Sequence, residues 1–406
     1  MPQISLTPKH ATAITATLGL LSLFPPLATD MYLAALGDLA TSMGSTHKAA
    51  EFSLSIFFLG LCLGQLLLGP LTDSYGRKKP LLVGTALFTA TSIALPLVND
   101  ISWFNALRFL QAIGASAGMV VGRAVVNDLY EGRRAAQVMT VLVMLLTIGP
   151  IASPTLGSIL LENFGWRSIF ATMAIISIVA FALSLVVLPE TLPASARKAR
   201  PLIDGARAAG MLLSQRRFVV MALVSGFVQG GMFAFITGSS GVFQGIFGLS
   251  ALEFGIMFAV IAAALIIFGK VNGVLLNRYN TTQISTAGLP VFVASTVVLA
   301  SVSSTQSLWV FVLPLWISIG MVGLLSANAM SITMELSGKG AGMGSALLGA
   351  VQFAIAFTVS TCVALGGTDT ALPMALGLFI PASFATILFF ALGGRVQNNP
   401  VCEDLA

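Results

Sequence analysis

The feature that most constrains this chain is a repeated run of apolar residues, each long enough to cross a lipid bilayer. A transmembrane helix needs about 20 consecutive apolar residues. Runs of this length recur twelve times in the sequence. They lie at about 11–35, 50–71, 79–98, 102–124, 136–160, 167–189, 217–240, 251–274, 283–303, 307–330, 342–365 and 370–393. The pattern predicts an all-α membrane protein, because a helix satisfies its own backbone hydrogen bonds in hydrocarbon.

The composition agrees with a surface that faces lipid. Hydrophobic residues make up 56% of the chain and charged residues 9%, whereas a soluble domain is about 45–50% apolar and about 25% charged. The net charge of +5 does not indicate a nucleic-acid partner, because the basic residues are spread over short connections. Cys62, Cys362 and Cys402 stand far apart, which argues against a disulfide or metal framework.

One polar segment, 190–216, interrupts the regular succession of apolar runs. It predicts a linker between an N-terminal bundle at 1–189 and a C-terminal bundle at 217–406. The connection after the second run has a glycine four residues before a polar residue, Gly69 and Asp73. The connection after the eighth run repeats this spacing with Gly273 and Asn277, although its other residues match less well. We therefore expect two pseudo-symmetric six-helix bundles, with a substrate site near the bilayer midplane between them.

The distribution of basic residues predicts the orientation in the membrane. Lys and Arg gather in cytoplasmic connections of membrane proteins. If the N-terminus is cytoplasmic, most of the 20 basic residues fall in connections on the cytoplasmic side. Both termini are therefore expected in the cytoplasm. The run from Ala11 to Leu33 is too long for a signal peptide and carries Asp30, so we interpret it as a retained first span.

The connection at 69–80 is short, polar and dense in charge. Gly69 and Gly76 permit close helix approach and a tight turn. Asp73 stands four residues before Arg77, at the end of the second apolar run. The residues alone are explained by a charged turn that keeps this connection in the cytoplasm and so sets the topology.

Five stretches resemble motifs of the major facilitator superfamily and, within it, of the bicyclomycin/chloramphenicol-resistance branch of drug:proton antiporters. They are the loop signature Gly69–Pro80, the fourth-span motif Leu107–Gly114, the fifth-span motif Gly149–Gly157, the first-span motif Asp30–Leu33 and the seventh-span motif Phe235–Ser239. The resemblance implies the major facilitator fold. It also implies a gate at the loop signature, where Asp73 holds a neighbouring helix end in one conformation and releases it in the other. Ala34 and Ser240 stand where the branch usually has proline.

Asp30 is the residue whose charge conflicts most clearly with its apolar neighbours in the sequence. It lies toward the outer end of the first run, and no other carboxylate lies well inside a run. Charged groups inside a bilayer are costly and usually functional. A carboxyl without a cationic partner in apolar surroundings binds a proton readily, so we expect Asp30 to couple transport to protons. The alternative is a carboxylate solvated at the outer membrane interface, and for Tyr32 beside it the alternative is an interfacial aromatic belt.

Arg108 is the one cation deep within a run, and Gln111 shares its helical face. The resemblance implies that Arg108 tunes proton release or holds polar groups in a cavity. The alternative is a structural bond to a backbone carbonyl. In the fifth run, Pro150 and Pro154 remove backbone donors beside Gly149. The resemblance implies a leak-tight contact that favours antiport, and an ordinary packing kink is the alternative.

Other polar and aromatic residues inside the runs are expected to line a substrate cavity, although each aromatic residue is as readily explained by packing. The candidates for substrate binding are Tyr32, Phe58, Gln65, Gln111, Phe233, Phe235, Thr237, Asn328 and Gln352. Many apolar groups with few polar ones suit a small, moderately lipophilic substrate.

No enzyme signature, phosphate loop or metal-ligand cluster stands in the sequence, so neither catalytic activity nor a cofactor is expected. The hypothesis is a monomeric, proton-coupled secondary transporter in a bacterial cytoplasmic membrane that exports drugs. The alternatives are a proton-coupled transporter of a natural metabolite, such as a nucleoside or amino acid, and a membrane receptor or scaffold without turnover.

Overall fold

The computed structural model describes residues 8–197, 201–338 and 341–393, which form helices joined by short connections without strands. In this part of the chain, 12 helices are long and apolar enough to cross a membrane, from Lys9–Ser42 to Leu372–Ala391. The prediction of an all-α membrane protein with twelve transmembrane helices is confirmed. Several spans run further than the apolar runs do.

The elements divide around α9 (Pro201–Leu213) into a first half and a second half, and these names are used below. The first half holds α1 (Pro8–Ser22), α2 (Phe24–Asp30), η1 (Leu33–Ala35), α3 (Leu36–Ser42), α4 (His47–Tyr75), α5 (Lys78–Ala94), η2 (Leu95–Leu97), α6 (Ile101–Leu129), α7 (Gly132–Phe164), α8 (Trp166–Val187) and η3 (Ala194–Ala196). The second half holds α10 (Arg216–Ser240), η4 (Gly241–Ile246), α11 (Ala251–Leu275), α12 (Thr281–Ser301), α13 (Leu308–Leu336), α14 (Ala341–Gly366), α15 (Leu372–Leu388) and η6 (Phe389–Gly393). The domain boundaries 1–189, 190–216 and 217–406 stay a prediction.

Span one is not a single continuous helix. Pro25 and Pro26 lie at the start of α2, where the missing N–H of proline costs no helical hydrogen bond. Helix α2 ends at Asp30, and the 3₁₀ turn η1 follows at Leu33–Ala35. The backbone therefore leaves the α-helical path next to Asp30, although Ala34 is not a proline.

Span seven shows a similar departure. Helix α10 ends at Ser240, and the six residues of η4 that follow form a π-helix. Such segments are rare and often lie at functional sites. Ala34 thus lies within a stretch that is not α-helical, and Ser240 directly precedes one.

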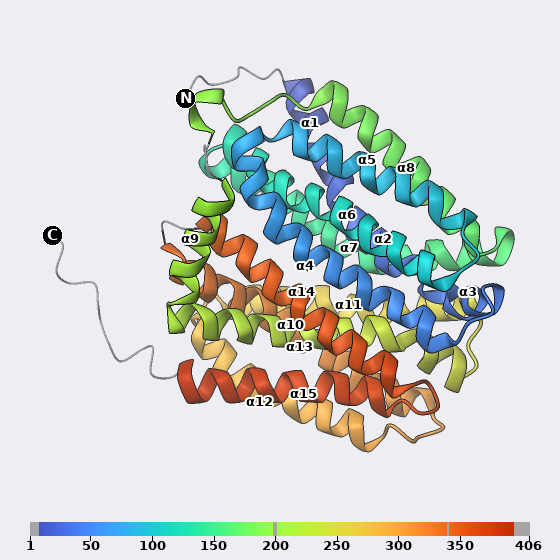
Figure 1. The fold of residues 1–406 in the computed structure, drawn as a ribbon. Coiled ribbons are helices and arrows are strands. Elements are labelled where there is room, and N and C mark those ends of the chain that lie inside the picture. Colours follow the sequence, from blue (N-terminus) through green and yellow to red (C-terminus); the bar gives the residue numbers. More distant parts are fainter. Residues whose placement is uncertain (1–7, 198–200, 339–340, 394–406) are drawn as a thin grey trace.

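The two halves lie side by side, with the first half coloured blue to green and the second half yellow-green to red (Figure 1). Helix α4 packs along α14, and α7 packs along α11. Small residues allow membrane helices to approach closely. Gly349 of α14 leaves the space that the side chain of Gln65 in α4 occupies, and Gly255 of α11 lies against the backbone of Thr155 in α7.

Helix α9 crosses the contact between the halves at one end of the molecule (Figure 1). Gly205 of α9 lies against Pro70 of α4 and near Met343 of α14. The end of the molecule that carries α9 is called the α9 face below, and the opposite end is called the η4 face. The loop signature lies on the α9 face, because it follows Pro70 along the chain.

Candidate transport site

Asp30 is buried in the first half, at the break in span one. Its side chain is 1% exposed, and its Oδ1 has no hydrogen-bond partner. Within the described ranges, no ion pair joins Asp30 to a cation. A buried carboxylate in such a place is costly unless it binds a proton or acquires a partner. The surroundings therefore fit a proton-binding group, a role that stays a prediction.

Arg108 of α6 is fully buried and makes contacts in several directions. Its guanidinium donates to the carbonyl of Ala28 in α2 at 2.7 Å and to Oε1 of Gln111. The same group lies 4.5 Å from the ring centroid of Tyr32 and 4.3 Å from that of Phe57. Aromatic faces attract cations most strongly where water is absent. Arg108 thus finds acceptors and rings in place of water.

The polar network around Arg108 extends to two more helices of the first half. Nε2 of Gln111 donates to Oγ of Ser92 in α5 at 2.9 Å. The hydroxyl of Tyr32 lies 2.8 Å from Oγ of Ser53 in α4. Tyr32 is fully buried, so it does not belong to an interfacial belt. The network ties α2, α4, α5 and α6 together beside Asp30.

The structure buries a second carboxyl that the sequence pattern did not single out. Glu51, the fifth residue of α4, has 1% of its side chain exposed. Its Oε1 lies 3.4 Å from Nε2 of His47. Because Glu51 starts an apolar run beside His47 and Lys48, its sequence position resembles that of a solvated span end. Residues of the second half, more than a hundred positions away in sequence, help to bury it.

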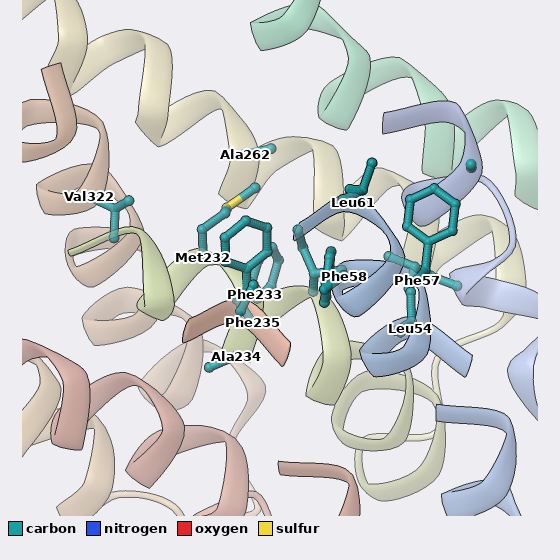
Figure 2. Packing of buried hydrophobic residues seen from close by; sticks show 14 of the residues in the cluster. Leu54, Phe57, Phe58, Leu61, Met232, Phe233, Ala234, Phe235, Ala262 and Val322 are labelled. Atoms are coloured by element: carbon teal, nitrogen blue, oxygen red, sulfur yellow. The ribbon is translucent and has the colours of Figure 1, made fainter. Parts of the chain in front are cut away.

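Aromatic residues from both halves meet at the contact between α4, α10 and α14. The ring of Phe58 lies 4.7 Å from that of Phe233, and Phe233 lies 5.8 Å from Phe353, between ring centroids. Figure 2 shows Phe58 on the side of α4 that faces Phe233, with Phe57 on the other side of α4. The sequence analysis proposed Phe58 and Phe233 but missed Phe353, because a lone phenylalanine in an apolar run gives no signal.

Three hydroxyl groups form a chain of hydrogen bonds from one half to the other. Oγ of Ser55 in α4 donates to Oγ of Ser360 in α14 at 2.8 Å. Ser360 lies 2.7 Å from Oγ1 of Thr237 in α10. All three side chains are buried. Thr237 was a predicted site residue, whereas the two serines were missed because serine is common in membrane helices.

The remaining candidates of the second half bind partners within that half. Asn328 donates to Oδ1 of Asn272 at 2.8 Å, and the amide of Gln352 donates to Oγ of Ser225 at 3.1 Å. The ring of Phe235 stacks on that of Phe258, at 4.6 Å between centroids. These three predicted residues, Asn328, Gln352 and Phe235, are thus not brought together with Asp30.

Gln65 is the predicted residue that lies most directly between the halves. Its side chain is 1% exposed and packs on Gly349 of α14. Its Oε1 has no hydrogen-bond partner, and its Nε2 lies 4.0 Å from Sδ of Met119. Buried polar atoms without a partner are uncommon in proteins, and a role of Gln65 in substrate binding stays a prediction.

The loop signature forms an ionic cluster on the α9 face. Arg77 donates to Asp73 at 2.8 Å and to Asp128, at the end of α6, at 3.0 Å. The backbone N–H of Arg77 donates to Glu190, after α8, at 2.8 Å. Gly76 has φ of 88°, and a Cβ there would overlap the carboxylate of Glu190. The connection therefore joins the ends of three helices of the first half.

The cluster fixes the charge of its central residue. Burial alone would lower the pKa of Arg77, but hydrogen bonds and charges of Asp73 and Asp128 raise it above its ordinary value. Arg77 therefore stays cationic at any physiological pH. Sequence reasoning found Asp73 and Arg77 but missed Asp128 and Glu190, since charges in connections are ordinary.

The motif of the fifth span lies between span one and the second half. Gly149 of α7 packs on Pro26, and Gly157 leaves no room for a Cβ beside the carbonyl of Met31. Pro150 and Pro154 stand inside α7, and both remove a backbone donor. Next to Pro154, Thr155 donates from Oγ1 to the carbonyl of Gly255 in α11 at 3.1 Å.

The two halves touch near both faces of the molecule. On the η4 face, Nε2 of Gln244 donates to the carbonyl of Ala34 at 3.2 Å. Toward the α9 face, Arg123 of α6 donates to Oγ of Ser345 in α14 at 2.9 Å. Hydrogen bonds thus join the two halves near both faces.

Comparison with known proteins identifies the family of this chain. A model of the Major Facilitator Superfamily matches residues 18–361. An uncharacterized MFS-type transporter of Bacillus subtilis, YdgK, is 33% identical over 97% of this chain and 98% of its own. A bicyclomycin resistance protein homolog of Haemophilus influenzae is 27% identical over 95% of this chain and 98% of its own. A chloramphenicol resistance protein of Pseudomonas aeruginosa is 32% identical over 79% of this chain and 76% of its own.

A solved structure shares the fold at low sequence identity. The crystal structure of a D-xylose-proton symporter matches with a TM-score of 0.76 and 14% identity, over 93% of this chain and 97% of that chain. Within the described ranges, no group of three or more His, Cys, Asp and Glu residues could hold a metal ion. The chain belongs to the Major Facilitator Superfamily, in the branch of the bicyclomycin and chloramphenicol resistance proteins, and it is a multi-pass membrane transporter rather than an enzyme.

Proposed function

We propose that this transporter exports small, moderately lipophilic drugs of the chloramphenicol or bicyclomycin kind in exchange for protons. The observation that carries the proposal is Asp30, a buried carboxyl with a free Oδ1 beside the network of Arg108. Intramembrane ionisable groups commonly serve proton relays in transporters. The names of the relatives in Haemophilus and Pseudomonas support the substrate class.

The proposed cycle alternates access between the two faces. Protonation of Asp30 from the outer side accompanies release of the drug, and return to the inward-open state delivers the proton to the cytoplasm. Moving one charge across about 100 mV is worth about 2.3 kcal/mol, enough for a concentration ratio of about fifty. Arg108 holds the backbone of α2 through Ala28, so it positions Asp30 and modulates its proton affinity.

The α9 face is proposed to be cytoplasmic, in a bacterial inner membrane, with both chain termini on that side and a monomer as the working unit. Arg77, Lys78 and Lys79 all lie at the connection on this face, which agrees with the preference of basic residues for the cytoplasmic side. The ionic cluster around Arg77 then serves as the gate on the cytoplasmic side, with Gly69, Asp73 and Gly76. Gly149, Pro150 and Pro154 seal α7 against its neighbours.

The experiment is uptake of labelled chloramphenicol into proteoliposomes with an imposed pH gradient. An acidic lumen should drive drug into the wild-type vesicles, and a protonophore should abolish this uptake. Asp30→Asn should lose gradient-driven uptake, because the variant side chain cannot carry a proton. Asp38→Asn is the matched control, since Asp38 lies on the same span but is exposed.

Full gradient-driven uptake by Asp30→Asn would contradict the proposal. Accumulation only when the outside is acidic would instead indicate symport, as expected for uptake of a natural metabolite.

A further inference from the structure

Glu51 lies where the two halves meet on the η4 face. It comes from α4 of the first half, while the second half covers it with Gly238 of α10, Gly241 of η4 and Thr368 of the turn between α14 and α15. A cavity of about 10 Å³ lies among these residues, close to the volume that a single water molecule needs. The contact between the halves therefore contributes to the burial of this carboxyl.

We propose that Glu51 is a second proton-binding site, and that a proton on the Glu51–His47 pair is required for the two halves to close on the η4 face. The inference rests on the proposed proton-coupled transport, but it concerns a different carboxyl and a different step. Asp30 lies at the break in span one, next to the network that Arg108 forms within the first half.

The physical reason is the cost of burying an unpaired charge. When the η4 face is open, Glu51 is solvated and its charge costs little. When the face closes, the residues of the second half around Glu51 offer it no cation. A carboxylate without a partner opposes closure. One proton, on Glu51 or on His47 as its counter-ion, removes that opposition, and by linkage the closed state binds this proton more tightly than the open state does.

The charged groups near Glu51 agree with this scheme. His47 is the nearest, with Nε2 at 3.4 Å from Oε1, and 28% of its side chain is exposed. Lys48 turns away, because its Nζ donates to the carbonyl of Leu365 at 3.4 Å. From the second half, Asp369 approaches Lys48 around Gly367. The remaining residues at the cavity are uncharged.

In this scheme, proton binding to the Glu51–His47 pair comes between drug release and closure of the η4 face. After the drug has left on the outer side, an external proton binds the Glu51–His47 pair and allows the η4 face to close. Without that proton the empty transporter stays open outward. Closure is thereby linked to the acidic side of the membrane.

The test measures the distance across the η4 face as a function of pH in the full-length protein. Spin labels at Thr41→Cys of α3 and Leu372→Cys of α15, both exposed, report the separation of the halves in a background without native cysteines. From about pH 5 to about pH 9, which spans the ordinary range of carboxyl and imidazole groups, the wild-type distance should shift from short to long. Glu51→Gln should give the short distance at every pH.

Two further variants make the result specific. His47→Gln should move the transition to lower pH, because the proton then has only the carboxyl to bind. Glu162→Gln is the matched control. Glu162 also joins the halves on this face, through the backbone N–H of Leu252 at 3.0 Å, but it is exposed. Its variant should keep the wild-type transition.

A wild-type distance that does not change with pH, or a Glu51→Gln variant that keeps the wild-type transition, would overturn the inference. Measuring the same distance between the spin labels in the Asp30→Asn variant distinguishes the proposal for Glu51 from the proposal for Asp30. A transition that persists there and vanishes in Glu51→Gln supports the role of Glu51 even if Asp30→Asn retains proton-driven uptake.

Discussion

The two halves of this transporter have similar helices but different buried chemistry. The first half buries Asp30, Glu51 and Arg108. In the described part of the second half, the buried polar side chains are all neutral, and Asn272 and Asn328 are typical of them. Since ionisable residues inside a membrane are costly and usually functional, the difference indicates a division of work. We infer that protons are handled in the first half, while the second half offers a neutral, aromatic surface.

The largest expected effect follows from removing the cation of the first half. Arg108→Ala leaves the carbonyl of Ala28 and the amide of Gln111 without their donor, and hydrogen bonds to charged groups are worth about 1.5–3 kcal/mol each. We expect a clear fall in the thermal unfolding midpoint in detergent and loss of transport. The unfolding midpoint of Arg108→Lys should lie between those of the wild type and Arg108→Ala. A lysine ammonium group keeps the charge but cannot reproduce the planar pair of donors of the guanidinium group. An unchanged midpoint in Arg108→Ala would show that the network does not hold the first half together.

A smaller effect is expected from the ionic cluster, and it compares corresponding connections of the two halves. Arg77→Ala removes bonds to Asp73 and Asp128, so it should cost about 1.5–3 kcal/mol of stability. Arg278→Ala is the matched control, since Arg278 follows α11 in the second half and is exposed. It should change stability by less than about 0.5 kcal/mol. If chemical denaturation showed the same loss of stability for Arg77→Ala and Arg278→Ala, the ionic cluster would not distinguish the two halves.

The smallest effect on proton coupling is expected from the amide pair of the second half. Asn328→Leu leaves the amide of Asn272 unpaired and should cost about 1–3 kcal/mol. Replacing both residues by leucine should recover much of that loss, because no buried polar group is then left alone. In uptake assays at several pH values, both variants should keep the pH profile of the wild type. A shifted profile would mean that the second half also takes part in proton binding.

Much of the fold could be predicted because it follows from bilayer thickness and backbone hydrogen bonding. The twelve apolar runs predicted the twelve spans, and the predicted and observed spans differ only at their ends. The breaks beside Asp30 and after Ser240 could not be predicted from proline, because neither Ala34 nor Ser240 is one. Those breaks depend on packing between helices that are distant in sequence.

For the site, the sequence revealed the residues whose chemistry conflicts with their apolar neighbours. Asp30 and Arg108 stood out in this way. Glu51 did not, because residues of the second half help to bury it. Ser55 and Ser360 did not, because their hydroxyl groups are ordinary in a helix. The contacts between halves are tertiary, so the spacing within one run gives no indication of them.

The most direct test of the central claim, that Asp30 is the group at which proton and drug exchange, is proton release on drug binding. Chloramphenicol is added to the purified protein in weakly buffered detergent solution, and the pH change is recorded alongside calorimetric binding. The account predicts that the wild type and Asn328→Leu release a proton on binding, while Asp30→Asn binds the drug and releases none. Proton release by Asp30→Asn equal to that of the wild type would contradict it.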